Sequence, residues 1–168
     1  TRFYRNDGGV FTRFDAGIVG VYSGSLAWGD YDNDGDPDLA IAGSADAAGT
    51  IRIARIYRNE GATFTDIGAP LTGTFGGSVA WGDVDGDGDL DLAIMGGGQP
   101  AHVYRNDGQA FVDQGGSLVA GIVGNVDWAD ADLDGDLDLM LSGGALSAGQ
   151  FYRNDAGTLV NTGCLPPT

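Results

Sequence analysis

Residues 81–94 read Trp-Gly-Asp-Val-Asp-Gly-Asp-Gly-Asp-Leu-Asp-Leu-Ala-Ile, and this stretch occurs in related form three times in the 168-residue chain. The other copies occupy residues 28–41 and 128–141, so that successive tryptophans are 53 and 47 residues apart. Self-similarity at a fixed period of this length is the signature of a repeat architecture. The sequence therefore predicts a tandem array.

A second marker, Tyr-Arg-Asn, keeps the same phase, starting at Tyr4, Tyr57, Tyr104 and Tyr152. Each period predicts four short strands: one ending at the tryptophan, one after the acidic stretch, one carrying Tyr-Arg-Asn, and one after a tight turn. The predicted fold class is all-β, with β-propeller blades of four antiparallel strands and about three and a half blades in the chain. A β-sandwich, the alternative architecture, gives no reason for such regular repetition.

The whole chain, residues 1–168, is expected to be a single array of these blades. A half blade is predicted at residues 2–15, followed by blades at residues 25–67, 78–114 and 125–163. Closed propellers use roughly four to eight blades, so we expect that this chain does not close a ring alone. Its ring would be completed in a homo-oligomer, with two copies the simplest case, or by further blades of a longer parent chain.

A nine-residue acidic loop separates the first two predicted strands of each copy, with aspartate at positions 1, 3, 5, 7 and 9 and glycine at position 6. Carboxylates crowded in this way repel one another unless a cation lies among them. Oxygen ligands at positions 1, 3 and 5, a glycine at the sharp turn and a carbonyl at position 7 are typical of Ca²⁺ sites, and position 9 supplies a closing carboxylate. We therefore expect three calcium ions per chain. The predicted metal-site residues are Asp30, Asp32, Asp34, Asp36, Asp38, Asp83, Asp85, Asp87, Asp89, Asp91, Asp130, Asp132, Asp134, Asp136 and Asp138.

Other interpretations of the loop fit less well. Mg²⁺ prefers to keep its waters, and Zn²⁺ would need nearby His or Cys. An EF-hand needs a glutamate at position 12, where Ile41, Ile94 and Leu141 stand instead. A merely solvated acidic turn would not recur three times in one register.

The pattern Trp-Gly-Asp-x-Asp-x-Asp-Gly-Asp-x-Asp-Leu-Ala-Ile, followed by Tyr-Arg-Asn-x-Gly, resembles the FG-GAP/VCBS repeat family, found in integrin α-subunit propellers and many bacterial surface proteins. The resemblance covers essentially the whole chain. It implies that loop positions 1, 3, 5 and 9 bind calcium through their side chains and position 7 through its carbonyl. It also implies that ligands bind on the face opposite the calcium loops. The integrin-type Phe-Gly and Gly-Ala-Pro strings occur once each, at residues 75–76 and 68–70, so the bacterial type of repeat is nearer.

The charge balance bears on partners and location. The net charge is −16, and fifteen of the 24 acidic residues belong to the three loops. We expect no nucleic-acid partner, because phosphates would be repelled, and no membrane insertion, because no apolar run is long enough. The chain begins without Met, which predicts a processed or excised piece, and its single Cys164 forms no internal disulfide. A secreted or cell-surface protein is expected, since free Ca²⁺ there fills even weak sites.

Several residues outside the loops have both a structural and a functional interpretation. The marker arginines could line an anion site, but pairing with nearby aspartates or carbonyls is expected; they are Arg5, Arg58, Arg105 and Arg153. The tryptophans could stack on sugars, but a fixed place in every blade favours the core. Asp127 stands where the other copies have alanine. It has two equal interpretations: a carboxylate that faces the central channel and binds a cation or ligand, or a channel-facing carboxylate that is merely tolerated. The only histidine, His102, is expected on the surface at the start of a third strand.

The function predicted from these features is a calcium-binding propeller module for extracellular adhesion, which binds a protein or glycan on the loop face opposite calcium. The first copy carries extra length on that face, at residues 44–52. The alternatives are the propeller of a carbohydrate-active enzyme and a purely structural spacer of a surface protein. We expect no enzyme, because no nucleophile and base stand together in the sequence.

Overall fold

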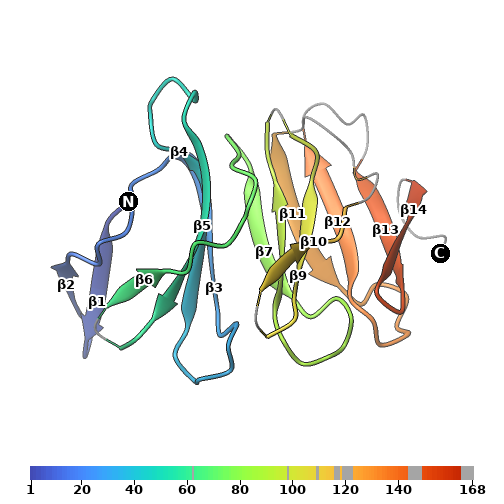
Figure 1. Cartoon of the computed structure of the whole chain (residues 1–168), viewed down its shortest axis with the longest axis horizontal. Helices are drawn as coiled ribbons and strands as arrows, with labels where there is room; N and C mark the ends of the chain where they lie inside the picture. The colour runs from blue at the N-terminus through green and yellow to red at the C-terminus, as the bar shows by residue number, and fades with distance from the viewer. Residues whose placement is uncertain are drawn as a thin grey trace.

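A computed structural model describes residues 1–61, 63–97, 99–108, 110–115, 118, 123–143 and 149–163. Over these ranges the chain forms fourteen strands and no helix (Figure 1), which confirms the all-β prediction; accordingly, no helix there is capable of crossing a membrane. The strands are β1 (Phe3–Asp7), β2 (Val10–Phe14), β3 (Tyr22–Gly29), β4 (Asp38–Ser44), β5 (Arg52–Asn59), β6 (Phe64–Asp66), β7 (Ser78–Gly82), β8 (Asp91–Met95), β9 (His102–Asn106), β10 (Phe111–Asp113), β11 (Gly124–Ala129), β12 (Asp138–Gly143), β13 (Gln150–Asp155) and β14 (Thr158–Gly163).

The strands form three four-stranded antiparallel sheets, each in simple sequence order, and one two-stranded hairpin, β1–β2. We call the three sheets blade one (β3–β6), blade two (β7–β10) and blade three (β11–β14). The blades stand face to face along the chain (Figure 1), and the first strand of blade two contacts the first strand of each neighbour. This is the arrangement expected of propeller blades.

The second strand of each blade lies deepest in its sheet. All residues of β4 and β8 are buried, because these strands pair on both edges and face other layers on both sides. Their alternation of Leu or Ile with Ala suits this position: the larger residues fill the space between blades and the alanines let the layers approach. One apolar core lies between blades one and two, and another between blades two and three.

A tryptophan–glycine contact fixes the spacing between neighbouring blades. The Trp81 indole Nε1 donates to the Ala27 carbonyl at 3.2 Å, and Trp128 Nε1 donates to the Ala80 carbonyl at 3.3 Å. Each ring lies against the glycine of the preceding blade: a Cβ added at Gly29 or Gly82 would come within 2.7 Å of the Trp81 or Trp128 ring, respectively. The glycine of the Trp-Gly-Asp motif is therefore required by the next blade.

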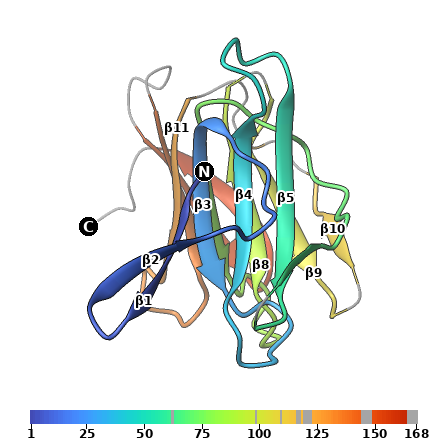
Figure 2. The same cartoon turned by 90° about the vertical axis from the view of Figure 1, so that its left-hand side faces the viewer.

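The prediction that all three tryptophans are core residues is wrong for Trp28, which is 49% exposed. Trp28 belongs to the first blade, so no earlier blade covers its ring. The β1–β2 hairpin covers part of it through an edge-to-face contact between Phe3 and Trp28. Phe3 also contacts Phe64, whose ring packs on Trp28 as well. Figure 2 shows the hairpin crossing this end of the array obliquely.

The expected pairing of the marker arginines is confirmed: Arg5, Arg58, Arg105 and Arg153 each lie within ion-pair distance of an acidic side chain. The surface assignment of His102 is wrong. Its side chain is only 18% exposed, with Nδ1 2.9 Å from Asp113 and the ring stacked on Tyr104. The cause is the pairing of β9 with β10, which brings the two side chains together; no sequence motif marks this contact. Cys164 lies outside the described residues.

Candidate metal centres

Three aspartates from each acidic loop come together at one end of their blade. They occupy loop positions 1, 3 and 9, and in each group one carboxylate oxygen from each aspartate lies within 4.8 Å of the other two. The groups are Asp30, Asp32 and Asp38; Asp83, Asp85 and Asp91; and Asp130, Asp132 and Asp138. The same three positions converge in every blade, so the repeat builds one kind of centre three times.

The aspartate at position 9 is held rigidly because it starts the buried second strand. In blade two, Asp91 is fully buried, and its two carboxylate oxygens accept hydrogen bonds from the backbone N–H groups of Val84 and Asn106, at 2.7 and 2.8 Å. Asp38 and Asp138 accept the equivalent pairs of bonds in the other blades. The position 9 carboxylate thus links the acidic loop to the third strand of the same blade by hydrogen bonds.

The aspartate at position 1 shapes the turn. Asp83 accepts hydrogen bonds from the N–H groups of Asp87 and Gly88 at loop positions 5 and 6, and Asp30 accepts the equivalent bonds in the first loop. The glycine at position 6 has φ of +93°, +96° and +101° in the three loops. Because side chains are strained at such φ values, glycine is required there.

Positions 5 and 7 lie outside the three groups. The position 5 carboxylates accept the N–H of position 7 two residues later, at 2.9 to 3.0 Å. Two position 7 side chains bind neighbouring segments: Asp89 accepts a hydrogen bond from Asn33 and Asp136 one from the N–H of Ala156. A side chain engaged in this way leaves the backbone carbonyl of position 7 as the group to face an ion, as the family resemblance implies.

The electrostatics of the centres favour a cation. Burial raises the pKa of Asp38 and of Asp91 to about 6, against the hydrogen bonds from their backbone N–H partners. Desolvation, with the nearby Asp34 carboxylate, also raises the pKa of Asp32. One buried oxygen in each of two centres, Oδ1 of Asp85 and of Asp130, has no hydrogen-bond partner. Unpartnered buried carboxylate oxygens are costly unless an ion satisfies them.

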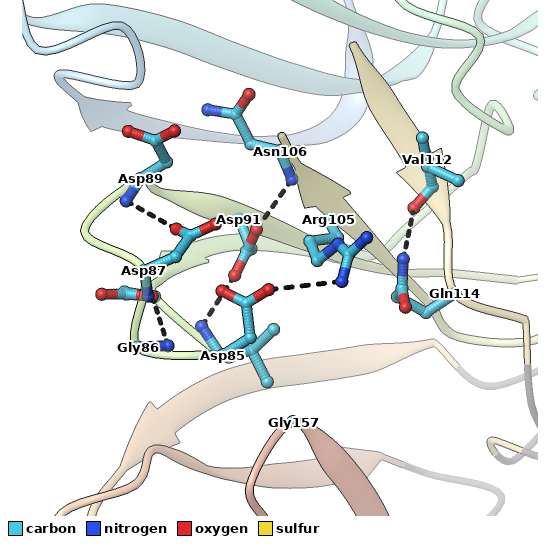
Figure 3. Close-up of polar contacts among 12 residues, drawn as sticks. Asp85, Gly86, Asp87, Asp89, Asp91, Arg105, Asn106, Val112, Gln114 and Gly157 are labelled. Atoms are coloured by element: carbon cyan, nitrogen blue, oxygen red, sulfur yellow. Dashed lines mark hydrogen bonds and ion pairs between the residues drawn. The ribbon is translucent and has the colours of Figure 1, made fainter. Parts of the chain in front are cut away.

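Figure 3 shows the second centre, with Asp85 and Asp91 beside the turn that carries Asp87 and Asp89. An all-oxygen donor set on a turn of this kind suits Ca²⁺, so the residues present fit the predicted ion. The carboxylates at positions 1, 3 and 9 would hold it. The Arg105 guanidinium lies 3.5 Å from the Asp85 carboxylate and contributes a positive charge beside this centre (Figure 3).

The sequence interpretation missed the asparagine of the Tyr-Arg-Asn marker. Asn106 donates from Nδ2 to the carbonyl of Tyr31 in the preceding blade at 2.8 Å, and Asn154 likewise donates to the carbonyl of Val84 at 2.7 Å. Tyr31 and Val84 stand at loop position 2, between two aspartates of the metal centre. The asparagine recurs at the same place in every repeat, and this recurrence could have indicated a structural role. Its partner lies in the preceding blade, however, and the sequence of a single repeat does not show which residue of another blade it contacts.

Comparison with known families agrees with this geometry. The model of the FG-GAP-like repeat matches residues 30–94 and, overlapping, residues 83–141. Each match runs from one acidic loop through the next, and together they span the three metal centres. No curated protein matches the chain. With three acidic loops in register on three four-stranded blades, and family matches over most of its length, this chain belongs to the FG-GAP-like repeat family.

Proposed function

We propose that the chain is a calcium-stabilised interaction module that works outside the cell and binds a protein or a glycan at the end opposite the acidic loops. The observation that carries this proposal is the separation of charge between the two ends. The acidic loops join first strands to second strands at one end. At the other end, the described connecting residues carry two charged side chains, Asp15 and Asp46; these residues are 15–21, 45–51, 67–77, 96–97, 99–101, 114–115, 118, 123 and 149.

The connection between β4 and β5, residues 45–51, projects from this end, which has few charges (Figures 1 and 2). Asp46 organises it: its carboxylate accepts hydrogen bonds from the N–H groups of Thr50 and Ile51, both at 2.8 Å, and from the Ser44 hydroxyl at 2.6 Å. These bonds hold the pKa of Asp46 well below its usual range. Preorganisation of this kind lowers the entropy cost of binding.

The tip of this loop presents aliphatic side chains to solvent. Ala47, Ala48 and Ile51 are exposed, and Gly49 packs on the Phe75 ring of the connection to blade two. A fixed, partly apolar tip whose only charge is the hydrogen-bonded Asp46 carboxylate suits a polypeptide or neutral glycan rather than a polyanion. Extracellular calcium, which fills even weak sites, would keep the blades in place beneath it.

A glycan array and a protein pull-down, each run with calcium and with chelator, test the proposal. The matched variants are Ala48→Arg at the loop tip and Thr63→Arg in an exposed turn at the acidic end. Both add one positive charge. We expect Ala48→Arg alone to abolish the captured signal. Equal loss from both variants, or full binding by Ala48→Arg, would place the ligand elsewhere.

We also propose that the module is not catalytic and that its blades belong to a larger ring. The His102 ring faces Asp113, and Asp127 accepts the N–H of Trp128, so neither is arranged with the other as an acid–base pair. The ring would be closed by a second copy or by further blades of a longer chain. Ala129 stands where Gly29 and Gly82 receive a tryptophan, which favours a neighbour without that tryptophan over a second copy presenting Trp28. Light scattering in calcium separates the two: a monomer excludes the second copy.

A further inference from the structure

A cleft opens between blades two and three, beside the second metal centre. Its volume is about 540 Å³, which is in the range of small-molecule binding sites. Its floor is apolar and consists of the buried side chains of Val103, Leu118 and Tyr152. Exposed polar side chains complete the lining: Arg105, Gln114, Thr158 and Asn161. The cleft therefore joins an apolar interior to a polar rim.

The preceding pair of blades closes the equivalent space with aromatic rings. Between blades one and two, Tyr31 and Phe111 pack on each other with their ring centroids 5.5 Å apart. A cleft of about 490 Å³ lies beside these rings, but the residues that line it do not include the buried Tyr104, which is the equivalent of the tyrosine on the floor. In the next pair of blades, Val84 and Leu159 stand at the positions of the two rings. Because these side chains are smaller, the cleft there reaches the buried floor.

Arg105 differs from the other marker arginines in its partner. Arg5, Arg58 and Arg153 each pair with the acidic residue two positions later, at 2.5 to 2.7 Å. The Arg105 guanidinium instead lies 3.5 Å from the Asp85 carboxylate, which also lines the cleft (Figure 3), and strong charge-assisted hydrogen bonds are shorter than this. A calcium ion in the second centre would take up the charge of Asp85. The guanidinium can therefore pair with an anion in the cleft.

Two amide side chains, one from each blade, lie on the rim. Gln114 follows β10 of blade two and donates from Nε2 to the Val112 carbonyl at 3.2 Å; Asn161 belongs to β14 of blade three and donates from Nδ2 to Gln150 at 3.3 Å. A side-chain amide has two N–H donors and an acceptor oxygen, so each of these groups can also bond to a ligand. Peptide groups present the matching donors and acceptors. The rim therefore suits a ligand that contains amides of its own.

We propose that this cleft binds the C-terminal end of a polypeptide whose last residue is aliphatic. The last side chain enters the apolar floor, the terminal carboxylate pairs with Arg105, and the peptide groups bond to Gln114 and Asn161. A chain end carries all three kinds of group within one or two residues, which suits the small size of the cleft. An acidic sugar fits less well, because Val84 and Leu159 offer no flat aromatic face for its ring. The site lies beside an acidic loop, so it is separate from the ligand surface proposed at the opposite end.

Isothermal titration calorimetry of the whole chain in calcium tests the site, with N-acetyl-alanyl-leucine as the probe. The control ligand is the same dipeptide with a C-terminal carboxamide, and glucuronate represents the acidic sugars. The matched protein variants are Arg105→Gln in the cleft and Arg153→Gln, which changes the same marker residue one blade later, outside the lining of the cleft. Leu159→Phe restores the aromatic residue of the preceding blade and fills the cleft without removing a polar group. A melting curve of each variant in calcium checks that it is folded.

We expect one saturable site for the probe. Affinity should fall at least about tenfold with the carboxamide and with Arg105→Gln, because each removes one partner of a charge-assisted hydrogen bond. It should fall similarly with Leu159→Phe and stay unchanged with Arg153→Gln, and the side-chain amide resonances of Gln114 and Asn161 should shift when the probe binds. A chain that does not bind the probe at millimolar concentration overturns the proposal. Equal binding of the carboxamide, equal loss from the two arginine variants, or tighter binding of glucuronate overturns it as well.

Discussion

Replacing Asn154 with alanine tests whether the marker asparagine fastens one blade to the metal loop of the blade before it. The Asn154 side chain is fully buried. Its Nδ2 donates to the Val84 carbonyl of blade two at 2.7 Å and to the Leu137 carbonyl of its own blade at 3.1 Å, and its Oδ1 accepts the N–H of Gly157 at 2.8 Å. Asn154→Ala removes all three bonds and leaves the buried Val84 carbonyl and the partly buried Leu137 carbonyl without this donor.

Asn59→Ala is the matched control within the same chain. Asn59 makes the equivalent bonds inside its own blade, from Nδ2 to the Pro37 carbonyl at 2.9 Å and from the N–H of Gly61 to Oδ1 at 3.0 Å, and neither of these bonds reaches another blade. A net hydrogen bond contributes about 1 kcal/mol, and a buried group left without a partner costs about 1 to 3 kcal/mol. We therefore expect a loss of about 1 kcal/mol for Asn59→Ala and about 3 kcal/mol for Asn154→Ala.

Urea unfolding in saturating calcium, followed by tryptophan fluorescence and far-UV circular dichroism, measures both losses. Because a stack of repeats depends on its nearest-neighbour interfaces, Asn154→Ala should also lower the apparent m-value, as blade three begins to unfold separately. Equal losses from the two variants would refute the role of the bond between blades. An Asn154→Ala protein as stable as the unsubstituted chain would do so more directly.

Three further outcomes follow from the centres and the blade contacts. Chelator should lower the melting temperature and calcium should restore it, because the carboxylate groups repel one another without the ion; an unchanged melting curve in chelator would contradict this. Asp87→Ala should reduce the calcium stoichiometry, measured by calorimetry, from three to two. Burial raises the pKa of Asp38 and Asp91 to about 6, so the calcium-free folded state holds these protons more tightly than the unfolded chain; its stability should fall as pH rises from about 4 through 6. The calcium-stripped protein should therefore melt higher at pH 5 than at pH 7, with a calcium-induced gain that is smaller at pH 5, and the reverse order in stripped protein would contradict this assignment. Gly82→Ala should cost about 1 to 3 kcal/mol in urea unfolding, because its Cβ would meet the Trp128 ring at 2.7 Å, whereas Gly20→Ala, with only the Thr1 nitrogen at 3.5 Å, should be close to neutral; similar losses would show that the blade contact is not tight.

The sequence predicts those parts of the molecule that each repeat specifies within itself. Apolar residues at period two, a glycine at the turn and aspartates at alternate positions depend on one strand or one loop. The three sheets, their strand order and the convergence of positions 1, 3 and 9 are accordingly local consequences of one period. The positive φ at Gly35, Gly88 and Gly135 is the backbone reason for the glycine that the motif shows.

Features that depend on two repeats, or on the difference between them, are not predictable from the motif. Trp28 has the same sequence context as Trp81, yet it is half exposed because burial comes from the preceding blade. His102 is partly buried because β9 pairs with β10 in a register that places Asp113 beside it. The partners of position 7 also differ between loops: Asp89 binds Asn33, a residue unique to the first loop.

The residue at loop position 2 explains why metal binding and blade stacking belong to one system. Val84 lies between the metal-centre residues Asp83 and Asp85; its N–H donates to Asp91 of the same centre, and its carbonyl accepts Asn154 of the next blade. Tyr31 does the same between blades one and two, where its ring also stacks on Trp81. An ion that fixes the three aspartates therefore also fixes the position 2 peptide group, whose carbonyl accepts the hydrogen bond from the next blade. Loss of calcium from one loop should loosen the following interface before it unfolds the blade that held the ion, because the strands of that blade keep their own ladder. Hydrogen exchange in chelator would show this order as earlier exposure of the Trp128 indole N–H than of the amides in β8, and simultaneous exchange would mean that each blade unfolds as an independent unit.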